Sequence, residues 1–372
     1  MARRTAKCSV YNLPEMLALQ ALTPERLARL VPAVTLAEAR KLVAQIHRGE
    51  AIAASSSIRR VAADAVREIG NVPNLDVIAE TPSAIDPFVK YLLAAPDGAR
   101  FEAVRIPLED PERFSVCVSS QVGCALGCAF CATGRMGLER NLDAWEIVEQ
   151  VRIVRARLPH GRVSANGEPS GCSADRSSIG RPRVHGVVFQ GMGEPLANLD
   201  AVLDAIAVFQ EPSALGIDAR AITVCTAGLP SGIRKLAERA PNVRLGLSIH
   251  SVRARRSIMP IDTAHSLDDV LAAAADHARA TGLSPMWAVT LLAGVNDSDD
   301  DARALATRAR EFRDATGRAP RISIIAYNDV PGDPFSRSSR EAEYRAALGM
   351  PSHRRYSGGG DVGAACGQLA AR

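Results

Sequence analysis

The chain has 372 residues, with 45 Lys and Arg against 41 Asp and Glu, a net charge of +4 and 47% hydrophobic residues. This composition excludes a wholly disordered chain and allows one large domain or two to three smaller ones. No apolar run is long enough to cross a bilayer and no signal sequence begins the chain, so we expect a cytoplasmic globular protein with no membrane partner.

The first part of the chain, residues 1–93, has the pattern of a small helical domain. Apolar residues recur at three- and four-residue spacing over 37–46 and 58–69, and a proline begins a further short helical stretch at 24–30. A solvated helical cap and an accessory domain that docks RNA both fit this pattern.

Residues 94–330 alternate between apolar, β-branched runs and helical stretches. Buried strands that alternate with helices indicate parallel βα units, so the sequence predicts an α/β fold with a partial (β/α)6 barrel. In such barrels the chemistry lies at the carboxyl ends of the strands. The expected strands are 115–118, 186–189, 222–224, 245–249, 287–291 and 322–325, and the expected helices are 144–157, 199–209, 232–239, 267–280 and 300–316.

Two segments break this alternation. Residues 160–183 are rich in Ser, Gly and Arg and predict a long loop inserted into the barrel. Residues 331–372 form a loop-rich C-terminal tail, in which three glycines at 358–360 precede Cys366. We expect these glycines to make the tail mobile.

Four of the eight cysteines lie between positions 117 and 131. Three of them, Cys124, Cys128 and Cys131, follow the first barrel strand on a loop whose glycines permit tight turns. Three thiolates are one short of a closed zinc site or a fully ligated four-iron cluster. A four-iron cluster would keep one iron open for an outside ligand, whereas structural zinc would need a distant fourth ligand.

This loop resembles that of the radical S-adenosylmethionine (SAM) superfamily, and the wider pattern resembles the RlmN/Cfr RNA methyltransferases. The resemblance is strong from Glu102 onward and weak over the first ninety residues. It implies a [4Fe-4S] cluster on Cys124, Cys128 and Cys131, whose open iron binds SAM, with two SAM used per turnover. The matching segments are 119–128, 130–134, 140–142, 191–196, 247–250, 259–261, 294–297 and 364–369.

The resemblance also implies a set of SAM contacts at the strand ends. Glycine lets the backbone approach a ligand closely, and a glutamate offers a carboxylate to the SAM ammonium group. Residues two apart on a strand share one face, as Ser248 and His250 do. The family commonly has Ser where Cys225 stands. The implied contacts are Gly193, Glu194, Cys225, Ser248, Ile249, His250 and Asn328.

A pair of cysteines outside the loop carries the most specific expectation. A thiolate both accepts a methyl group and acts as a sulfur nucleophile. The resemblance implies that Cys366 carries the methyl group and that Cys117 resolves a covalent RNA–protein adduct by forming a disulfide with Cys366. It further implies that Glu102 removes the adenine proton.

The implied target is C2 of an adenine in 23S rRNA, with tRNA as a second candidate. Three alternatives stay open. The enzyme could methylate C8 of the same adenine, as Cfr does, or it could act on another RNA substrate. The chain could also be a non-catalytic RNA-binding module with a structural metal. We expect a monomer that takes electrons from a protein such as flavodoxin. Because the net charge is small, RNA affinity should come from the N-terminal segment, the inserted loop, Arg354 and Arg355. The family usually has Arg-Gly-Asp-Asp where residues 358–361 stand.

Overall fold

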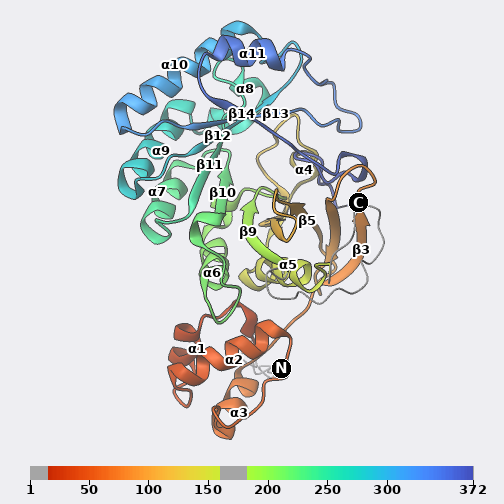
Figure 1. Ribbon diagram of the computed structural model, residues 1–372, viewed down its shortest axis with the longest axis vertical. Coiled ribbons are helices and arrows are strands. Elements are labelled where there is room, and N and C mark those ends of the chain that lie inside the picture. Colours follow the sequence, from red (N-terminus) through yellow and green to blue (C-terminus); the bar gives the residue numbers. More distant parts are fainter. Residues whose placement is uncertain (1–15, 160–181, 372) are drawn as a thin grey trace, which may run out of the picture. The chain divides into compact units, whose positions relative to one another are not determined.

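The computed structural model describes residues 16–159 and 182–371. The chain divides into two compact units, Met1–Pro73 and Asn74–Arg372 (Figure 1). The predicted inserted loop at 160–183 lies, apart from its last two residues, outside the described residues.

The first unit is helical, and its helices begin where the sequence predicts. Thr23 caps the first helix by accepting a hydrogen bond from the Arg26 amide, and Thr35 forms a capping box with Glu38 at the start of the second. Apolar side chains on the three helices form a small buried core. The elements are β1 (Leu17–Ala18), η1 (Leu19–Ala21), α1 (Pro24–Leu30), α2 (Leu36–Arg48), α3 (Arg60–Ile69) and β2 (Gly70–Asn71).

The second unit contains the predicted partial barrel. All six expected strands form, and they follow one another in parallel across a sheet that has ten strands within the described residues. A further parallel strand from the tail extends the sheet. These strands are β6 (Arg113–Val118), β9 (Arg183–Phe189), β10 (Ile222–Thr226), β11 (Arg244–Ser248), β12 (Met286–Leu291), β13 (Arg321–Ala326) and β14 (Ser352–Arg355).

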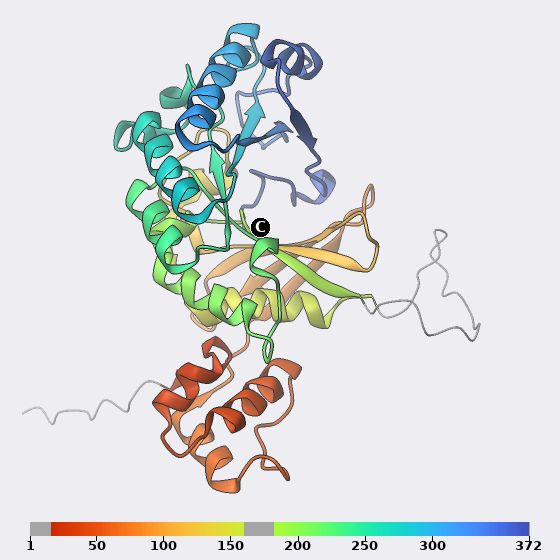
Figure 2. The same ribbon diagram turned by 60° about the vertical axis from the view of Figure 1, so that its left-hand side comes forward.

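Helices cover the outer side of this sheet. The five predicted helices all form, and their apolar faces are buried against the strands. Figure 2 shows them as a layer on one side of the strands, with the C-terminal tail on the opposite, concave side. They are α5 (Ala144–Ala156), α6 (Leu199–Gln210), α7 (Pro230–Arg239), α9 (Leu267–Thr281) and α10 (Asp299–Thr316), followed by α11 (Glu341–Leu348) in the tail.

The structure differs from the sequence analysis at residues 76–94, which form strands rather than helices. β3 (Asp76–Pro82), β4 (Val89–Ala94) and β5 (Arg100–Pro107) pair antiparallel and join the sheet beside β6. β3 alternates between exposed and half-buried residues, and its Ile78 is 50% exposed. Such an edge strand lacks the continuous apolar run that identified the barrel strands.

Short elements build the rim of the barrel. β7 (Gln121–Cys124) and β8 (Gly137–Asn141) form a hairpin around α4 (Ala132–Met136). The others are η2 (Pro195–Asn198), η3 (Ala219–Ala221), α8 (Arg255–Ile258), η4 (Pro260–Thr263) and η5 (Gly360–Val362). Among the residues that the structure describes, no helix combines the length and the apolar character needed to span a membrane.

Candidate active site

A cavity of ≈ 210 Å³ lies at the carboxyl ends of the parallel strands, where the fold predicts it. Most of the expected site residues line it. Among the described residues, Glu102, Ile249 and Asn328 are the expected ones that do not. Those that do are Cys117, Cys124, Cys128, Cys131, Gly193, Glu194, Cys225, Ser248, His250 and Cys366.

The cysteine loop is shaped by its glycines. Gly123 and Gly127 have φ of 75° and 62°, in the left-handed region that favours glycine. At Gly134 a Cβ would lie 2.9 Å from the Cys128 backbone nitrogen, so only glycine allows the following helix to pack on the loop. These turns direct all three loop thiols to one cavity.

The three loop thiols fit a cluster better than a single ion. Burial raises the pKa of Cys124 to about 11 and that of Cys128 to about 12, and it raises the pKa of Cys131 as well. Iron would displace these protons on binding. Three thiolates can hold a four-iron cluster and leave its fourth iron open, whereas a closed zinc site would need a fourth ligand.

Glu194 forms a fixed acidic wall of the cavity. Its carboxylate is 3% exposed and accepts hydrogen bonds from the Leu196 amide at 3.0 Å and the Ala227 amide at 2.8 Å. Burial raises its pKa. The preceding Gly193 has φ of 98°, and a Cβ there would lie 2.5 Å from the Gln121 side chain. Only glycine therefore fits at this position, because Gln121 occupies the space that a Cβ would take.

His250 is held in a strained conformation after β11. Its φ of 56° is unusual for a residue with a side chain. Its Nδ1 accepts a hydrogen bond from the Thr290 amide at 3.1 Å, and Asn296 donates to its carbonyl at 2.6 Å. Burial lowers its pKa to about 3. The ring is therefore neutral, and because Nδ1 accepts, the ring proton lies on Nε2, which can donate to a ligand.

Arg255 supports this wall from behind, and sequence reasoning missed it. The side chain is 2% exposed, and its Nη1 donates to the carbonyls of Ser248 at 2.6 Å and Ile249 at 2.7 Å. Its Nε pairs with Asp262 at 3.0 Å. Arg255 thus holds the backbone carbonyls of Ser248 and Ile249 in place. In the sequence, Arg255 lies in the segment Arg253-Ala254-Arg255-Arg256, whose composition resembles an ordinary charged surface.

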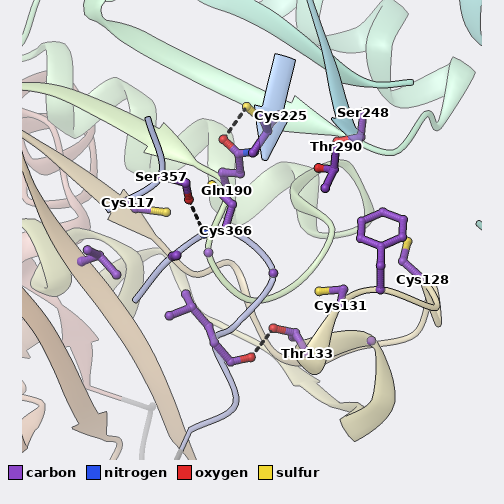
Figure 3. Close-up of a pocket in the computed structure, with 18 of the residues that line it drawn as sticks. Cys117, Cys128, Cys131, Thr133, Gln190, Cys225, Ser248, Thr290, Ser357 and Cys366 are labelled. Atoms are coloured by element: carbon purple, nitrogen blue, oxygen red, sulfur yellow. Dashed lines mark hydrogen bonds between the residues drawn. The ribbon is translucent and has the colours of Figure 1, made fainter. Parts of the chain in front are cut away.

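Cys117 and Cys225 lie on either side of Gln190, with the Cys117 sulfur directed toward the tail (Figure 3). Both are free thiols, 9% and 7% exposed. The Cys117 sulfur accepts from the Gln190 backbone amide, and the Cys225 sulfur donates to Gln190 Oε1 at 3.7 Å. Burial raises the pKa of Cys117 to about 12 and that of Cys225 to about 11.

The tail brings Cys366, also a free thiol, to the same cavity. The Cys366 amide donates to Ser357 Oγ at 2.8 Å, and Asn328 Nδ2 donates to the Cys366 carbonyl at 3.1 Å. The next residues dock on the cysteine loop, since the Ala132 amide donates to the Gly367 carbonyl at 2.7 Å. Asn328, an expected SAM contact, holds the tail in this structure.

Glu102 lies beneath the tail and is fully buried. Its Oε1 is 3.0 Å from Lys90 Nζ, and its Oε2 accepts from the Ala370 amide at 2.9 Å. The carboxylate is therefore covered by the chain end.

Two of the three tail glycines, Gly358 and Gly359, are closely packed. A Cβ at Gly358 would lie 2.4 Å from the Phe88 ring, and Gly359, with φ of 72°, donates to Asp86 at 2.8 Å. Asp361 accepts from Ser83 Oγ at 2.7 Å. The structure thus gives a reason for glycine where the family usually has Arg, because no side chain fits against Phe88.

Arg354 and Arg355, expected together on an RNA-binding surface, lie in different environments. Arg354 is 58% exposed and its Nε is 3.3 Å from Glu341. Arg355 lines the cavity. The prediction of a surface position is wrong for Arg355, because successive residues of a strand point to opposite faces.

Several known proteins are similar to this chain in sequence or in fold. The chain is 54% identical over 374 residues to a protein named probable RNA methyltransferase from Sorangium cellulosum, covering 94% of this chain and 91% of that protein. It is 37% identical over 301 residues to the dual-specificity RNA methyltransferase RlmN of Syntrophobacter fumaroxidans, covering 79% and 80%. A radical SAM methyltransferase from Sphaerobacter thermophilus superposes with a TM-score of 0.79 at 32% identity, covering 96% of this chain and all of that one. No family model matches the chain.

The chain belongs to the RlmN family of radical SAM RNA methyltransferases. The family resemblance, the α/β partial-barrel fold and the SAM-dependent methyltransferase class predicted from the sequence are confirmed. Radical SAM enzymes use a [4Fe-4S] cluster and SAM, and the three-thiol loop and the adjoining Glu194 wall fit both groups.

Proposed function

We propose that this RlmN-family enzyme methylates C2 of an adenine in 23S rRNA, and also in tRNA, through a methylated cysteine. The observation that supports this proposal is the meeting of two separate thiol sets in one cavity. The loop thiols suit a cluster, whereas Cys117 and Cys366 lie apart from the loop in sequence and are free. Most radical SAM reactions need no such second pair.

The loop and strand ends would hold the cofactors. Cys124, Cys128 and Cys131 would bind the cluster, which together with SAM supplies a 5′-deoxyadenosyl radical. The Glu194 carboxylate would accept hydrogen bonds from the SAM ammonium group, and Gly193 lines the cavity beside it. His250 Nε2 would donate a hydrogen bond to SAM. Ser248, Ile249, Cys225 and Asn328 complete the proposed SAM contacts.

The tail would supply the reacting sulfur. Cys366 would take a methyl group from one SAM and lose one hydrogen atom from it to the radical derived from the second. The resulting carbon radical would bond to the adenine, and the electron left on the adduct after proton loss would pass to the oxidised cluster. Glu102 takes the adenine proton, which requires the Ala370 amide to leave its carboxylate. Cys117 then attacks the Cys366 sulfur and releases the methylated RNA.

We also propose the wider setting of the reaction. The helical N-terminal part, residues 1–93 in the sequence analysis, would dock RNA, residues 94–330 would carry the cofactors and 331–372 the methyl carrier. The enzyme would act as a cytoplasmic monomer that receives electrons from a flavodoxin-like protein.

Two cysteine substitutions test the chemistry, because they should fail differently. Cys366→Ala should keep its iron yet form neither methylated RNA nor a covalent species. The Cys117→Ala enzyme should still form the bond to adenine, and the reaction should then stop with RNA cross-linked to the protein through Cys366. A denaturing gel with labelled RNA reads both results. Free methylated RNA at the normal rate from Cys117→Ala would refute the assigned roles.

The methylated carbon needs a separate experiment. Mass spectrometry of ribosomal RNA fragments from a deletion strain should show loss of 2-methyladenine. Loss of 8-methyladenine instead would move the activity to the other carbon.

A further inference from the structure

Arg355 has a position in the cavity that the proposed function does not use. It ends β14 and is the one Arg or Lys among the described residues that line the cavity. Its Nη1 is buried and has no hydrogen-bond partner within the described chain. No ion pair of Arg355 with a carboxylate occurs there either, whereas Arg354 pairs with Glu341. A cation placed in this way indicates a negative group inside the cavity.

The groups that face Arg355 are sulfur atoms. The thiols of Cys366, Cys225 and Cys117 line the same cavity, and each lies close enough to the guanidinium to interact with it electrostatically. Glu194 is the one Asp or Glu among the described lining residues, and backbone amides already hold its carboxylate. Among the described lining residues, the groups near Arg355 that can become negative are therefore thiols.

Among these thiols, Cys117 has the greatest need of a nearby positive charge. Its thiol must become a thiolate to act as a nucleophile. Burial, together with the nearby Cys366, raises its pKa to about 12, and Arg355 acts in the opposite direction. The other stabilising contact at this sulfur is the Gln190 backbone amide. A neighbouring opposite charge shifts a pKa by about 1–3 units.

We propose that Arg355 is a positioning residue for Cys117, whose guanidinium stabilises the sulfur anion that attacks Cys366. This inference rests on the proposed function. In the step, the Cys117 proton is lost to solvent and its sulfur forms a bond to the Cys366 sulfur. The bond from that sulfur to the methylene carbon breaks, and its electron pair passes to the carbon. The carbon takes a proton and leaves as the adenine methyl group.

The test uses the iron-loaded enzyme with labelled RNA and follows the cross-linked species on a denaturing gel. Arg355→Gln and Arg355→Met remove the charge, Arg355→Lys retains it, and Arg303→Gln, at an exposed arginine on α10, is the control. Both neutral variants should accumulate cross-linked RNA and resolve it about tenfold more slowly or worse, as loss of one pKa unit of stabilisation predicts. Arg355→Lys should restore most of the rate, and Arg303→Gln should leave it unchanged. Cys117→Ala is run beside them.

Each outcome separates this inference from the proposal it rests on. A cross-link in Cys117→Ala but none in either neutral Arg355 variant overturns the role of Arg355 alone. A neutral variant with weaker RNA binding and normal resolution shows a phosphate contact instead, and also overturns it. Normal turnover by Cys117→Ala overturns both proposals. If one neutral variant loses its iron, the comparison is made between the other neutral variant and Arg355→Lys.

Discussion

Two sides of the same cavity are built in different ways. The cysteine loop, residues 124–131, is fixed by its own glycines and by the hairpin from which it projects. The tail segment, residues 355–370, also has turns of its own, such as the hydrogen bond from the Cys366 amide to Ser357. Its docking on the rest of the unit, however, uses groups far away in the sequence, such as Thr133, Asn328 and Glu102. Local turns can hold a cluster in one place, whereas a segment held by a few separate hydrogen bonds can leave and return.

This difference suits the two tasks that we propose. Cluster ligands must stay together, because loss of any one thiolate opens a second iron. A methyl carrier must meet SAM, adenine and Cys117 in turn. The following experiments ask whether the two sides are as independent as their contacts indicate.

The largest effect is expected on the loop. Cys131→Ala removes one of three thiolates, so the anaerobically purified protein should lose its iron, about four per chain in the wild type, its brown colour and SAM cleavage together. Cys172→Ala, at a cysteine outside the predicted site, is the control and should retain all three. Iron content and 5′-deoxyadenosine production measure the result. Stoichiometric zinc in the wild-type protein would contradict the cluster.

The second experiment disturbs the tail. In Gly358→Ala the added Cβ meets the Phe88 ring, and such overpacking costs about 1–3 kcal/mol. We expect RNA methylation to fall roughly tenfold or more while iron content and SAM cleavage stay normal. Gly360→Ala is the matched control, because a Cβ there meets nothing within 4 Å. Loss of iron in Gly358→Ala would show that the two sides are coupled.

The sequence predicts the cysteine loop well and the docking of the tail poorly. The parallel strands, the loop glycines and the family segments could be recognised because each is a continuous local pattern. Asn328 and Glu102 were assigned to SAM and to adenine, yet in this structure both hold the tail. Arg255 and Arg355 lie within arginine runs whose composition does not show which side chain is buried. Contacts across hundreds of residues leave no local pattern, so the docking of the tail could not be predicted.

The third experiment uses pH to probe the wall on which His250 lies. Its pKa is about 3 in the folded protein, below the ordinary value of 6.5, so the unfolded chain takes up a proton first as pH falls. The stability contributed by neutral His250 is therefore complete above about pH 6.5. As the pH falls from 6.5 toward 3, this contribution to the free energy of unfolding decreases by up to about 1.4 kcal/mol per pH unit. His250→Asn tolerates the positive φ and does not titrate. Urea unfolding of the two proteins between pH 7 and pH 5 should show a shallower decline for the variant, and equal slopes would contradict the assigned pKa.

The smallest effect is expected where the two sides touch. Thr133, just after the loop, donates from Oγ1 to the Leu369 carbonyl at 2.6 Å and is 3% exposed. Thr133→Val keeps the shape of the side chain but leaves that carbonyl unpaired, at a cost of about 1–3 kcal/mol that falls on the tail. Hydrogen exchange at the Ala370 amide, which Glu102 protects, should therefore become faster, while SAM cleavage stays within about twofold of wild type because the loop keeps its own turns. Thr307→Val, which removes an exposed hydrogen bond on α10, is the control and should change neither quantity. Unchanged exchange at Ala370 would mean that the other tail contacts hold the chain end without Thr133, and the tail would then be as firmly fixed as the loop.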